Sequence, residues 1–397
     1  MKNFVFISPN FPLIFSHFVK SLREHNFNVL GIGDTPYCEI NEELKNYITE
    51  YYYLPNLSNY EDLFKAVAFF SFKYGHIDEL ESNNEYWLEY DARLRKDFNI
   101  NGLKSDEILK IKRKDLMKKY YDEALVKNAR YTLVNSIDDC YKFIEEVNYP
   151  VFVKPVIGVG ASDSYKLNNE EDLISFINNK DDELYIMEEY INGTIYSFDG
   201  IADKDSNVVC YASHVFTDSN AELVNNDLDS FYYMDFNPEE ELIEKGKRTI
   251  KAFGVKKRCF HLEFFKLNED KEGLGKKGDY VALEVNMRSG GGNVPELFKI
   301  GTGIDIYDIY ASVMNEEEIK IEKKDQYYAI EVTRQKKLNY VYEDDLIREM
   351  FKDNLYKIGK YDPIIAKGMG GEYFYIAKFL TLEEAFKFKN IILMKRD

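Results

Sequence analysis

The sequence lacks several features that define common protein classes. Its four cysteines, Cys38, Cys140, Cys210 and Cys259, are far apart and form no CxxC pair, which argues against a disulfide framework or a zinc site. No apolar run approaches the roughly 20 residues of a membrane span. The opening run MKNFVFISPNFP has one Lys and is interrupted by Pro9, so we expect a first strand rather than a signal peptide, and a cytoplasmic protein.

Positive charge is also scarce. The chain has 52 Lys and Arg against 70 Asp and Glu, a formal net charge of -18. Nucleic acids and anionic membranes attract clusters of Lys and Arg, so we expect neither as a partner. The balance still allows one local cationic pocket for a nucleotide.

Two common phosphate-binding motifs are missing. The turn SPNFP after the first expected strand lacks the GxGxxG of dinucleotide sites. The glycine-rich turn near Lys154 contains no Gly-Lys-Ser/Thr, so it is not a Walker A loop. We also find no internal repeat and no low-complexity segment.

The composition is that of a folded protein. Hydrophobic residues make up 45% of the sequence. The length of 397 residues is enough for two or three domains. The N-terminal region alternates strand, helix and strand, a pattern typical of a parallel sheet covered by helices. A basic helix is expected over about 106–121. The last 70 residues read as β-α-β-β-α-β, with a strand near 364–367.

The segment YVALEVNMRSGGGNVPE, residues 280–296, combines a buried strand with polar chemistry. Glu284 and Asn286 are two apart, so they share a strand face at a spacing of about 7 Å. If this strand pairs with FHLEFF as a hairpin, Glu263 lies beside them. Two carboxylates and an amide oxygen suit a hard cation such as Mg²⁺ or Mn²⁺.

A second polar element is Lys154 in the apolar strand VFVKP, followed by GVGAS. A lysine in such a strand needs an anion, and the glycines let backbone N–H groups approach oxygens closely. The strand MEEYI, residues 187–191, ends in acids before a turn and has no function by itself.

In this order, these segments resemble the ATP-grasp superfamily of carboxylate–amine ligases. KDLMKKY resembles its first lysine helix, VFVKPVIGVGAS its second lysine strand and loop, MEEYINGTIYSFDG its adenine hinge, and FHLEFF and LEVNMRSGGG its metal-binding strands. The resemblance implies an α/β (α+β) ATP-grasp fold with an N-terminal Rossmann-like preATP-grasp domain. The expected parts are 1–110 for that domain, 111–190 for the small lid subdomain, and 191–397 for the C-terminal subdomain with a β-rich tail at about 327–397.

The resemblance also implies a role for each matching residue. The residues expected to bind ATP are Lys114, Lys154, Gly158, Gly160, Ser162, Glu188, Glu189 and Ile191. Those expected to hold two Mg²⁺ (or Mn²⁺) ions are Glu263, Glu284 and Asn286. Arg288 is the expected catalytic residue, and Gly290, Gly291 and Gly292 shape the acceptor pocket.

The implied reaction forms an amide or peptide bond and releases ADP and phosphate. The L-amino acid ligase and carbamoyl-phosphate-synthase-like branches are the most similar, although a second ATP-grasp half and a biotin-carrier region are missing. Ile195 stands where many relatives have Glu, which removes one ribose contact, and Met287 replaces a common Pro. A kinase-like phosphotransferase and a non-catalytic ATP-binding protein are the alternatives.

The acid and the amine cannot be read from the sequence. Both are expected to be small molecules, and the resemblance is compatible with a homodimer. His214 and His261 are interpreted as ordinary strand histidines near the pocket. Arg334 and the segment GMGGE, residues 368–372, are placed within reach of the site from the tail.

Overall fold

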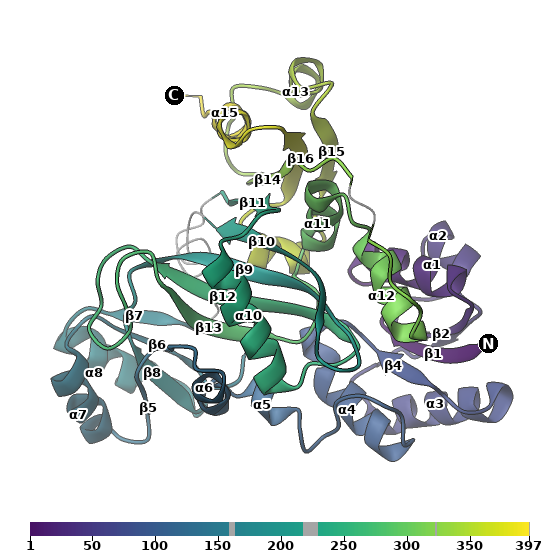
Figure 1. Ribbon diagram of the computed structural model, residues 1–397, viewed down its shortest axis with the longest axis horizontal. Helices are drawn as coiled ribbons and strands as arrows, with labels where there is room; N and C mark the ends of the chain where they lie inside the picture. Colours follow the sequence, from purple (N-terminus) through teal and green to yellow (C-terminus); the bar gives the residue numbers. More distant parts are fainter. Residues whose placement is uncertain (159–162, 217–228, 322–323, 397) are drawn as a thin grey trace.

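The computed structural model describes residues 1–158, 163–216, 229–321 and 324–396. Its strands form three sheets, one of four strands near the N-terminus, one of eight, and a second of four. Figure 1 shows the two small sheets on opposite sides of the large one, whose upper end is formed by the C-terminal strands with their helices. Within the described ranges, no helix is both long and apolar enough to cross a bilayer.

The N-terminal sheet is parallel, with the strand order β3-β2-β1-β4. Its central strands β1 and β2 are buried apolar runs, as expected for a parallel sheet covered on both faces. The strand order reverses between β1 and β4, and ligand crevices in α/β sheets lie beyond the carboxyl ends of strands at such a point. The elements are β1 (Lys2–Ile7), η1 (Leu13–Phe15), α1 (Ser16–Glu24), β2 (Phe27–Gly33), α2 (Glu42–Tyr47), β3 (Glu50–Tyr53), α3 (Tyr60–Tyr74), β4 (Glu79–Glu81), η2 (Glu85–Trp87) and α4 (Leu88–Asp97).

The prediction of one helix over 106–121 is wrong in one respect, because this segment forms two helices. Arg113 has an extended backbone that separates α5 (Leu109–Lys112) from α6 (Lys114–Glu123). The Lys114 N–H donates to the carbonyl of Val156 at 3.0 Å, just beyond strand β6. The break therefore places Lys114 at the start of a helix and beside the second sheet.

The second four-stranded sheet is antiparallel, in the order β5-β8-β6-β7. Its own hydrophobic cluster lies between the sheet and two helices. The elements are β5 (Tyr131–Leu133), α7 (Ile137–Val147), β6 (Val151–Pro155), β7 (Tyr165–Leu167), α8 (Glu170–Asn179) and β8 (Tyr185–Glu189).

The eight-stranded sheet has the order β13-β12-β9-β10-β11-β14-β16-β15. In Figure 1, α10 lies across one face, while α11 and α12 lie towards the N-terminal sheet. The first elements are β9 (Gly193–Ala202), β10 (Val208–Phe216), β11 (Phe231–Asp235), α10 (Glu240–Phe253), β12 (Arg258–Leu267), β13 (Tyr280–Asn286), α11 (Val294–Thr302) and α12 (Ile306–Asn315). The tail adds β14 (Tyr328–Arg334), α13 (Asp344–Met350), β15 (Leu355–Lys360), α14 (Pro363–Met369), β16 (Tyr373–Phe379) and α15 (Leu382–Ile392).

The expected strand near 364–367 is wrong, since these residues lie in α14. The Asp362 side chain accepts a hydrogen bond from the Ile364 N–H at 2.8 Å, and Pro363 occupies the first helical position. Both are strong helix-start signals that override the short apolar run. The tail consequently contains three helices as well as three strands.

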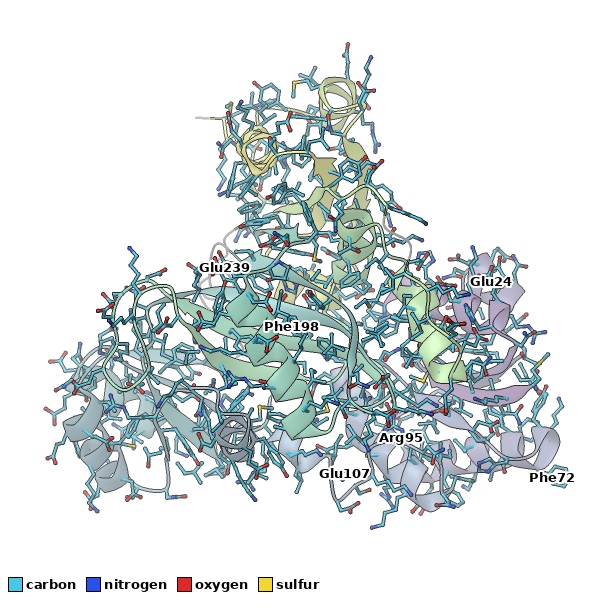
Figure 2. The ribbon with its side chains drawn as sticks, in the orientation of Figure 1. Glu24, Phe72, Arg95, Glu107, Phe198 and Glu239 are labelled. Atoms are coloured by element: carbon cyan, nitrogen blue, oxygen red, sulfur yellow. The ribbon has the colours of Figure 1, made fainter. Side chains whose placement is uncertain are left out.

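A buried ionic network joins the N-terminal sheet to the large sheet. Glu81, at the end of β4, pairs with Arg95 at 2.6 Å and with Arg258 of β12 at 2.8 Å. Figure 2 labels Arg95 in this region, between the N-terminal helices and the large sheet. The pairing fixes the carboxyl end of β4 relative to β12.

Candidate active site

Strands β12 and β13 carry a polar face opposite an apolar one. They pair antiparallel, so that Glu263 lies directly opposite Glu284, and His261 opposite Asn286. The intervening residues Leu262 and Val285 are buried in the cluster that includes α10. The alternation of side chains along a strand therefore gathers two carboxylates and an amide on one face.

Lys114 extends to this face from the start of α6. Its Nζ lies 3.5 Å from Glu284 Oε1 and donates to the carbonyl of Gly158 at 3.4 Å. The side chain is almost fully buried. Lys114 thus joins the carboxylate pair to the end of the glycine-rich segment that follows β6.

Glu188 of β8 is shared by two lysines. Its carboxylate lies 2.5 Å from Lys118 Nζ and 2.7 Å from Lys154 Nζ, and all three side chains are buried. Burial by itself would raise the pKa of Glu188, but the two ammonium charges outweigh it and lower the pKa to about 2. Glu188 is therefore an anion that holds two cations in an otherwise dry site.

Lys118 is a site residue that the sequence analysis did not predict. It follows Lys114 by four residues on α6, a spacing that places both on the same helix face. That spacing is the signal from which it could have been found. Burial lowers the pKa of Lys118, although the nearby Glu188 opposes this effect.

Glu189 and Ile191 have different surroundings from Glu188. The Glu189 carboxylate accepts two hydrogen bonds from the Arg130 guanidinium, at 3.1 and 2.8 Å, and its N–H donates to the carbonyl of Arg130. Ile191 is buried in a small apolar cluster with Leu267 and Val281. The hinge is thus anchored on both sides before any ligand binds.

Arg288 follows β13 and points towards the N-terminal sheet. Its Nε donates to Glu85 Oε2 at 3.2 Å, and its Nη2 to Asn286 Oδ1 at 3.4 Å. Glu85 stands four residues after β4, one of the two strands between which the strand order reverses. Neither the position nor the contact of Glu85 was expected from the sequence, because it depends on how two distant segments meet.

Three glycines follow Ser289, and the last of them, Gly292, lies against the tail. Gly292 has φ +57°, and a Cβ there would lie 2.6 Å from Met369 Cε. A Cβ on Gly290 would lie 2.5 Å from Val294 Cγ1, whereas none of the described atoms lies within 4 Å of the corresponding point on Gly291. The loop needs glycine for space at Gly290 and for backbone conformation at Gly292.

His214 and His261 are not ordinary strand histidines. Their Nδ1 atoms lie 2.6 and 2.7 Å from the two oxygens of Asp199 on β9, and their rings stack with centroids 5.2 Å apart. His261 Nε2 also lies 3.2 Å from Glu263 Oε1. The pKa of His261 is raised to about 9, because the two carboxylates outweigh the burial that would lower it.

The remaining predicted positions are Gly160, Ser162, Arg334 and the segment GMGGE. Gly160 and Ser162 lie outside the described residues. Arg334 is wrong as a site residue, since its side chain is buried in the tail and donates to the carbonyls of Ile392 and Tyr342 at 2.7 and 2.9 Å. Of the segment GMGGE, Met369 approaches the site through Gly292.

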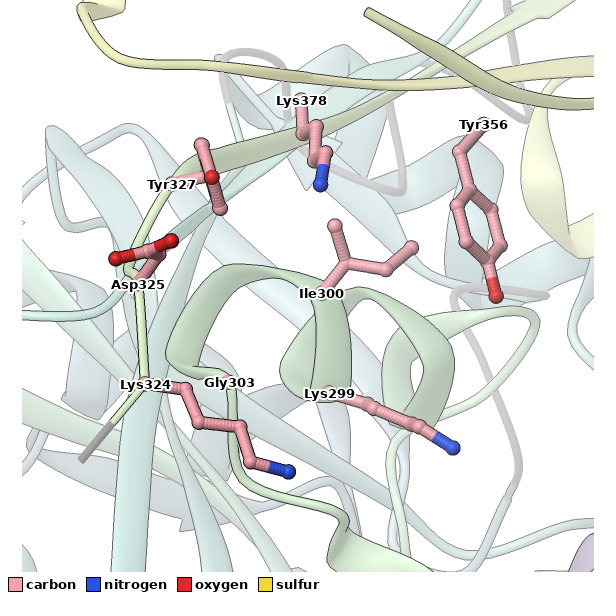
Figure 3. Close-up of a pocket in the computed structure, with 8 residues that line it drawn as sticks. All are labelled: Lys299, Ile300, Gly303, Lys324, Asp325, Tyr327, Tyr356 and Lys378. Atoms are coloured by element: carbon pink, nitrogen blue, oxygen red, sulfur yellow. The ribbon is translucent and has the colours of Figure 1, made fainter. Parts of the chain in front are cut away.

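A separate hollow of about 560 Å³ lies between α11 and the tail (Figure 3). Its lining residues are Lys299, Ile300, Gly303, Lys324, Asp325, Tyr327, Tyr356 and Lys378. None of the predicted site residues is among them. The chemistry gathered on β12 and β13 therefore lies elsewhere.

Comparison with known proteins places these residues in context. Residues 110–322 match the family model described as "Carbamoyl-phosphate synthase L chain, ATP binding domain". The chain is 24% identical over 251 residues to an L-arginine-specific L-amino acid ligase of Bacillus subtilis, an alignment that covers 59% of this chain and 57% of the relative. The chain thus spans little more than half the length of that relative.

Solved structures show the same architecture. An L-amino acid ligase from Bacillus licheniformis superposes with a TM-score of 0.74 at 16% identity, covering 99% of this chain and 97% of the other. The biotin carboxylase domain of the Hydrogenobacter thermophilus 2-oxoglutarate carboxylase, solved with MgADP and bicarbonate, has a TM-score of 0.64 at 16% identity, with 98% and 89% covered. At these identities the likeness establishes the fold.

Proposed function

The chain belongs to the family of carbamoyl-phosphate synthase L-chain ATP-binding domains, and from this premise we propose that it is an ATP-dependent carboxylate–amine ligase. Its fold is the ATP-grasp fold with an N-terminal Rossmann-like domain. The observation that carries the proposal is the pair of carboxylates Glu263 on β12 and Glu284 on β13, which lie directly opposite each other. Arg288 follows two residues after the end of β13. An acid pair beside a cation suits phosphoryl transfer from a metal-bound nucleotide.

Glu263, Glu284 and Asn286 would hold Mg²⁺ or Mn²⁺, two ions in our proposal. The set consists of oxygen donors, which these hard cations prefer. The pKa of Glu263 is lowered, since hydrogen bonding and charge from His261 outweigh its burial, so this carboxylate is ionised and ready to bind a cation. The ions would neutralise charge on the triphosphate.

Lys114, Lys118 and Lys154 would bind the ATP phosphates, with Gly158, Gly160 and Ser162 in the loop beside them. Glu284 forms an ion pair with Lys114, and Glu188 forms ion pairs with Lys118 and Lys154. A bound triphosphate would take over part of the role of the Glu284 and Glu188 carboxylates, so each lysine would have an anionic partner both with and without the nucleotide. The hinge carbonyl of Glu189 and the backbone of Ile191 would hold the adenine edge, with the Glu188 side chain next to the nucleotide.

The reaction would proceed in two steps, phosphorylation of the acid and attack by the amine. A carboxylate oxygen of the acid attacks the γ-phosphorus of ATP, the bond to the β-phosphate oxygen breaks, and ADP leaves. The amine nitrogen then attacks the carbonyl carbon of the acyl phosphate, the carbon–oxygen bond to phosphate breaks, and the nitrogen loses a proton to solvent. Arg288 would stabilise the transferring phosphoryl group and the tetrahedral intermediate.

The substrates would occupy the space between Arg288 and the N-terminal sheet. Glu85, which accepts a hydrogen bond from Arg288, and the carboxyl ends of β1 and β4 would border this space, and Gly290, Gly291 and Gly292 would form its other side. The carboxylate of Glu85 and the guanidinium of Arg288 offer groups for both a cationic and an anionic end of a small molecule. We propose small carboxylates and amines, amino acids foremost, as substrates.

The test is ADP release with Mg-ATP against a matrix of carboxylates and amines. The proposal predicts ADP only when an acid and an amine are both present. ADP with the acid alone would indicate a kinase-like phosphotransferase. Thermal stabilisation by ATP without ADP release across the matrix would indicate a nucleotide-binding protein without turnover.

A further inference from the structure

A buried row of ionisable side chains lies next to the proposed metal ligands and is not used in the reaction above. It consists of His214 on β10, Asp199 on β9 and His261 on β12, with 1%, 2% and 6% of each residue exposed. Asp199 and His261 are direct cross-strand partners in the sheet. The row is therefore fixed by strand register.

Its contacts lead to Glu263. Asp199 Oδ1 lies 2.7 Å from His261 Nδ1, and His261 Nε2 lies 3.2 Å from Glu263 Oε1. Both nitrogens of His261 thus face carboxylate oxygens, and the ring cannot rotate without losing one of these contacts. The stacked His214 ring, tilted by 10° relative to His261, restricts the same motion.

Stability gives no reason for this arrangement. Burying ionisable groups costs free energy, and apolar residues of similar volume at such sites are often as stabilising or more so. The contacts to His261 come from side chains, and one of them ends on a carboxylate that faces Glu284. Metal-binding carboxylates are typically held by hydrogen bonds of this kind, which fix their orientation.

We propose that His261, anchored by Asp199, is a positioning residue that orients Glu263 as a metal ligand. The hydrogen bond to Oε1 fixes the carboxylate rotamer and leaves Oε2 for the cation. The inference rests on the proposed function, because it takes Glu263 as a metal ligand. It concerns cation affinity and does not place His261 in contact with substrate.

Two substitutions separate the contacts of His261. In His261→Asn, the amide nitrogen replaces Nδ1, so the contact to Asp199 is retained and the contact to Glu263 is lost. In His261→Gln, the amide nitrogen replaces Nε2 and the contact to Glu263 is retained. Asp199→Asn removes the anchoring charge, and Ser197→Ala is the matched control, since Ser197 contacts Asp199 and His214 on the same strand face.

The experiment measures the dissociation constant of Mn²⁺ at saturating ADP, by electron paramagnetic resonance of free Mn²⁺. His261→Asn should weaken Mn²⁺ binding by about 10–100-fold, the usual effect of losing such a partner. His261→Gln should recover most of the affinity, and Ser197→Ala should remain within about twofold of wild type. ADP binding in EDTA should be the same for all of them.

Three results would overturn the inference. One is wild-type Mn²⁺ affinity in His261→Asn while Glu263→Gln loses binding, which leaves the proposed function intact. Another is equal loss in His261→Asn and Ser197→Ala, which would indicate a general packing role. A wild-type protein that binds ADP but no Mn²⁺ would remove both the inference and the metal assignment. If His261→Asn does not fold, the Mn²⁺ affinities of Asp199→Asn and Ser197→Ala are compared instead. Weaker binding in Asp199→Asn alone supports the inference, and equal affinities in the two variants overturn it.

Discussion

Lys114 Nζ lies 3.5 Å from Glu284 Oε1, so a lysine expected to bind phosphate contacts an acid expected to bind metal. The two opposite charges offset each other within the protein. When a triphosphate and its cations bind, Lys114 can exchange Glu284 for a phosphate oxygen, and Glu284 can exchange Lys114 for a metal cation. The free energy of bringing these charges together is supplied by folding, which leaves the site pre-organised.

Removing the charge of Glu284 should abolish metal-dependent turnover. Glu284→Gln is expected to lower kcat by at least about 100-fold, the effect of losing a major charge-stabilising contact, with the fold unchanged. The measurement is ADP release together with a melting curve. Glu272→Gln, in the exposed part of the β12–β13 connection, is the control and should behave as wild type. Wild-type turnover in Glu284→Gln would contradict the metal assignment.

Lys154→Ala should weaken ATP binding. The lysine is buried beside Glu188, and a hydrogen bond to a charged group contributes about 1.5–3 kcal/mol, which corresponds to roughly 10–150-fold in affinity. Lys118→Ala should have an effect in the same direction. Calorimetric titration with ATP measures both, and the exposed Lys119→Ala is the control on the same helix. Unchanged affinity in both buried variants would count against a phosphate role.

Gly292→Ala should destabilise the protein by about 1–2 kcal/mol, the cost of a left-handed conformation for a residue with a Cβ. Its φ is +57°, and the added methyl group also displaces Met369. Gly291→Ala is the matched control for stability, because none of the described atoms lies within 4 Å of its Cβ position. Chemical denaturation of the two variants makes the comparison. Equal stability would show that the loop conformation differs from the one described.

Stability should depend on pH through Glu331. Burial raises the pKa of this β14 carboxyl from 4.5 to about 7, although Tyr361 and Asn293 donate hydrogen bonds that lower it. Between these values the folded state binds more protons than the unfolded state, so stability falls as pH rises, by about 3 kcal/mol in total. Glu331→Gln imitates the protonated acid and should lose this component.

Unfolding of wild type and Glu331→Gln at pH 5 and pH 8 checks this prediction. The variant should be close to wild type at pH 5 and more stable than wild type at pH 8. Glu349→Gln, an exposed acid of α13, should show the same pH dependence as wild type. A constant difference between Glu331→Gln and wild type across this range would show that Glu331 does not titrate there.

The sequence predicted the fold class and much of what the site contains. Strand alternation placed Glu284 and Asn286 on one face, and the hairpin with FHLEFF brought Glu263 beside them, as the register confirms. These features are local, so a periodic pattern carries them. Lys118 follows the same kind of rule, since it is four residues from Lys114, but it is one of several lysines in a basic helix and the sequence alone did not single it out.

What the sequence could not give depends on contacts between distant segments. Glu85 meets Arg288 because η2, which follows β4, lies beside the segment after β13, about two hundred residues away in the chain. Asp199 becomes the partner of two histidines only when β9 lies between β10 and β12. The helix α14 differs in kind, because its start signals, Asp362 and Pro363, are local and override the short apolar run at 364–367.

The central claim is that the protein activates a carboxylate with ATP before the amine attacks. The most direct measurement uses an acid labelled with oxygen-18 in its carboxyl group, with Mg-ATP and an accepted amine, and follows the label by mass spectrometry. The account predicts that one labelled oxygen appears in the released phosphate, and that the amide retains the other. Unlabelled phosphate released along with the amide would contradict it.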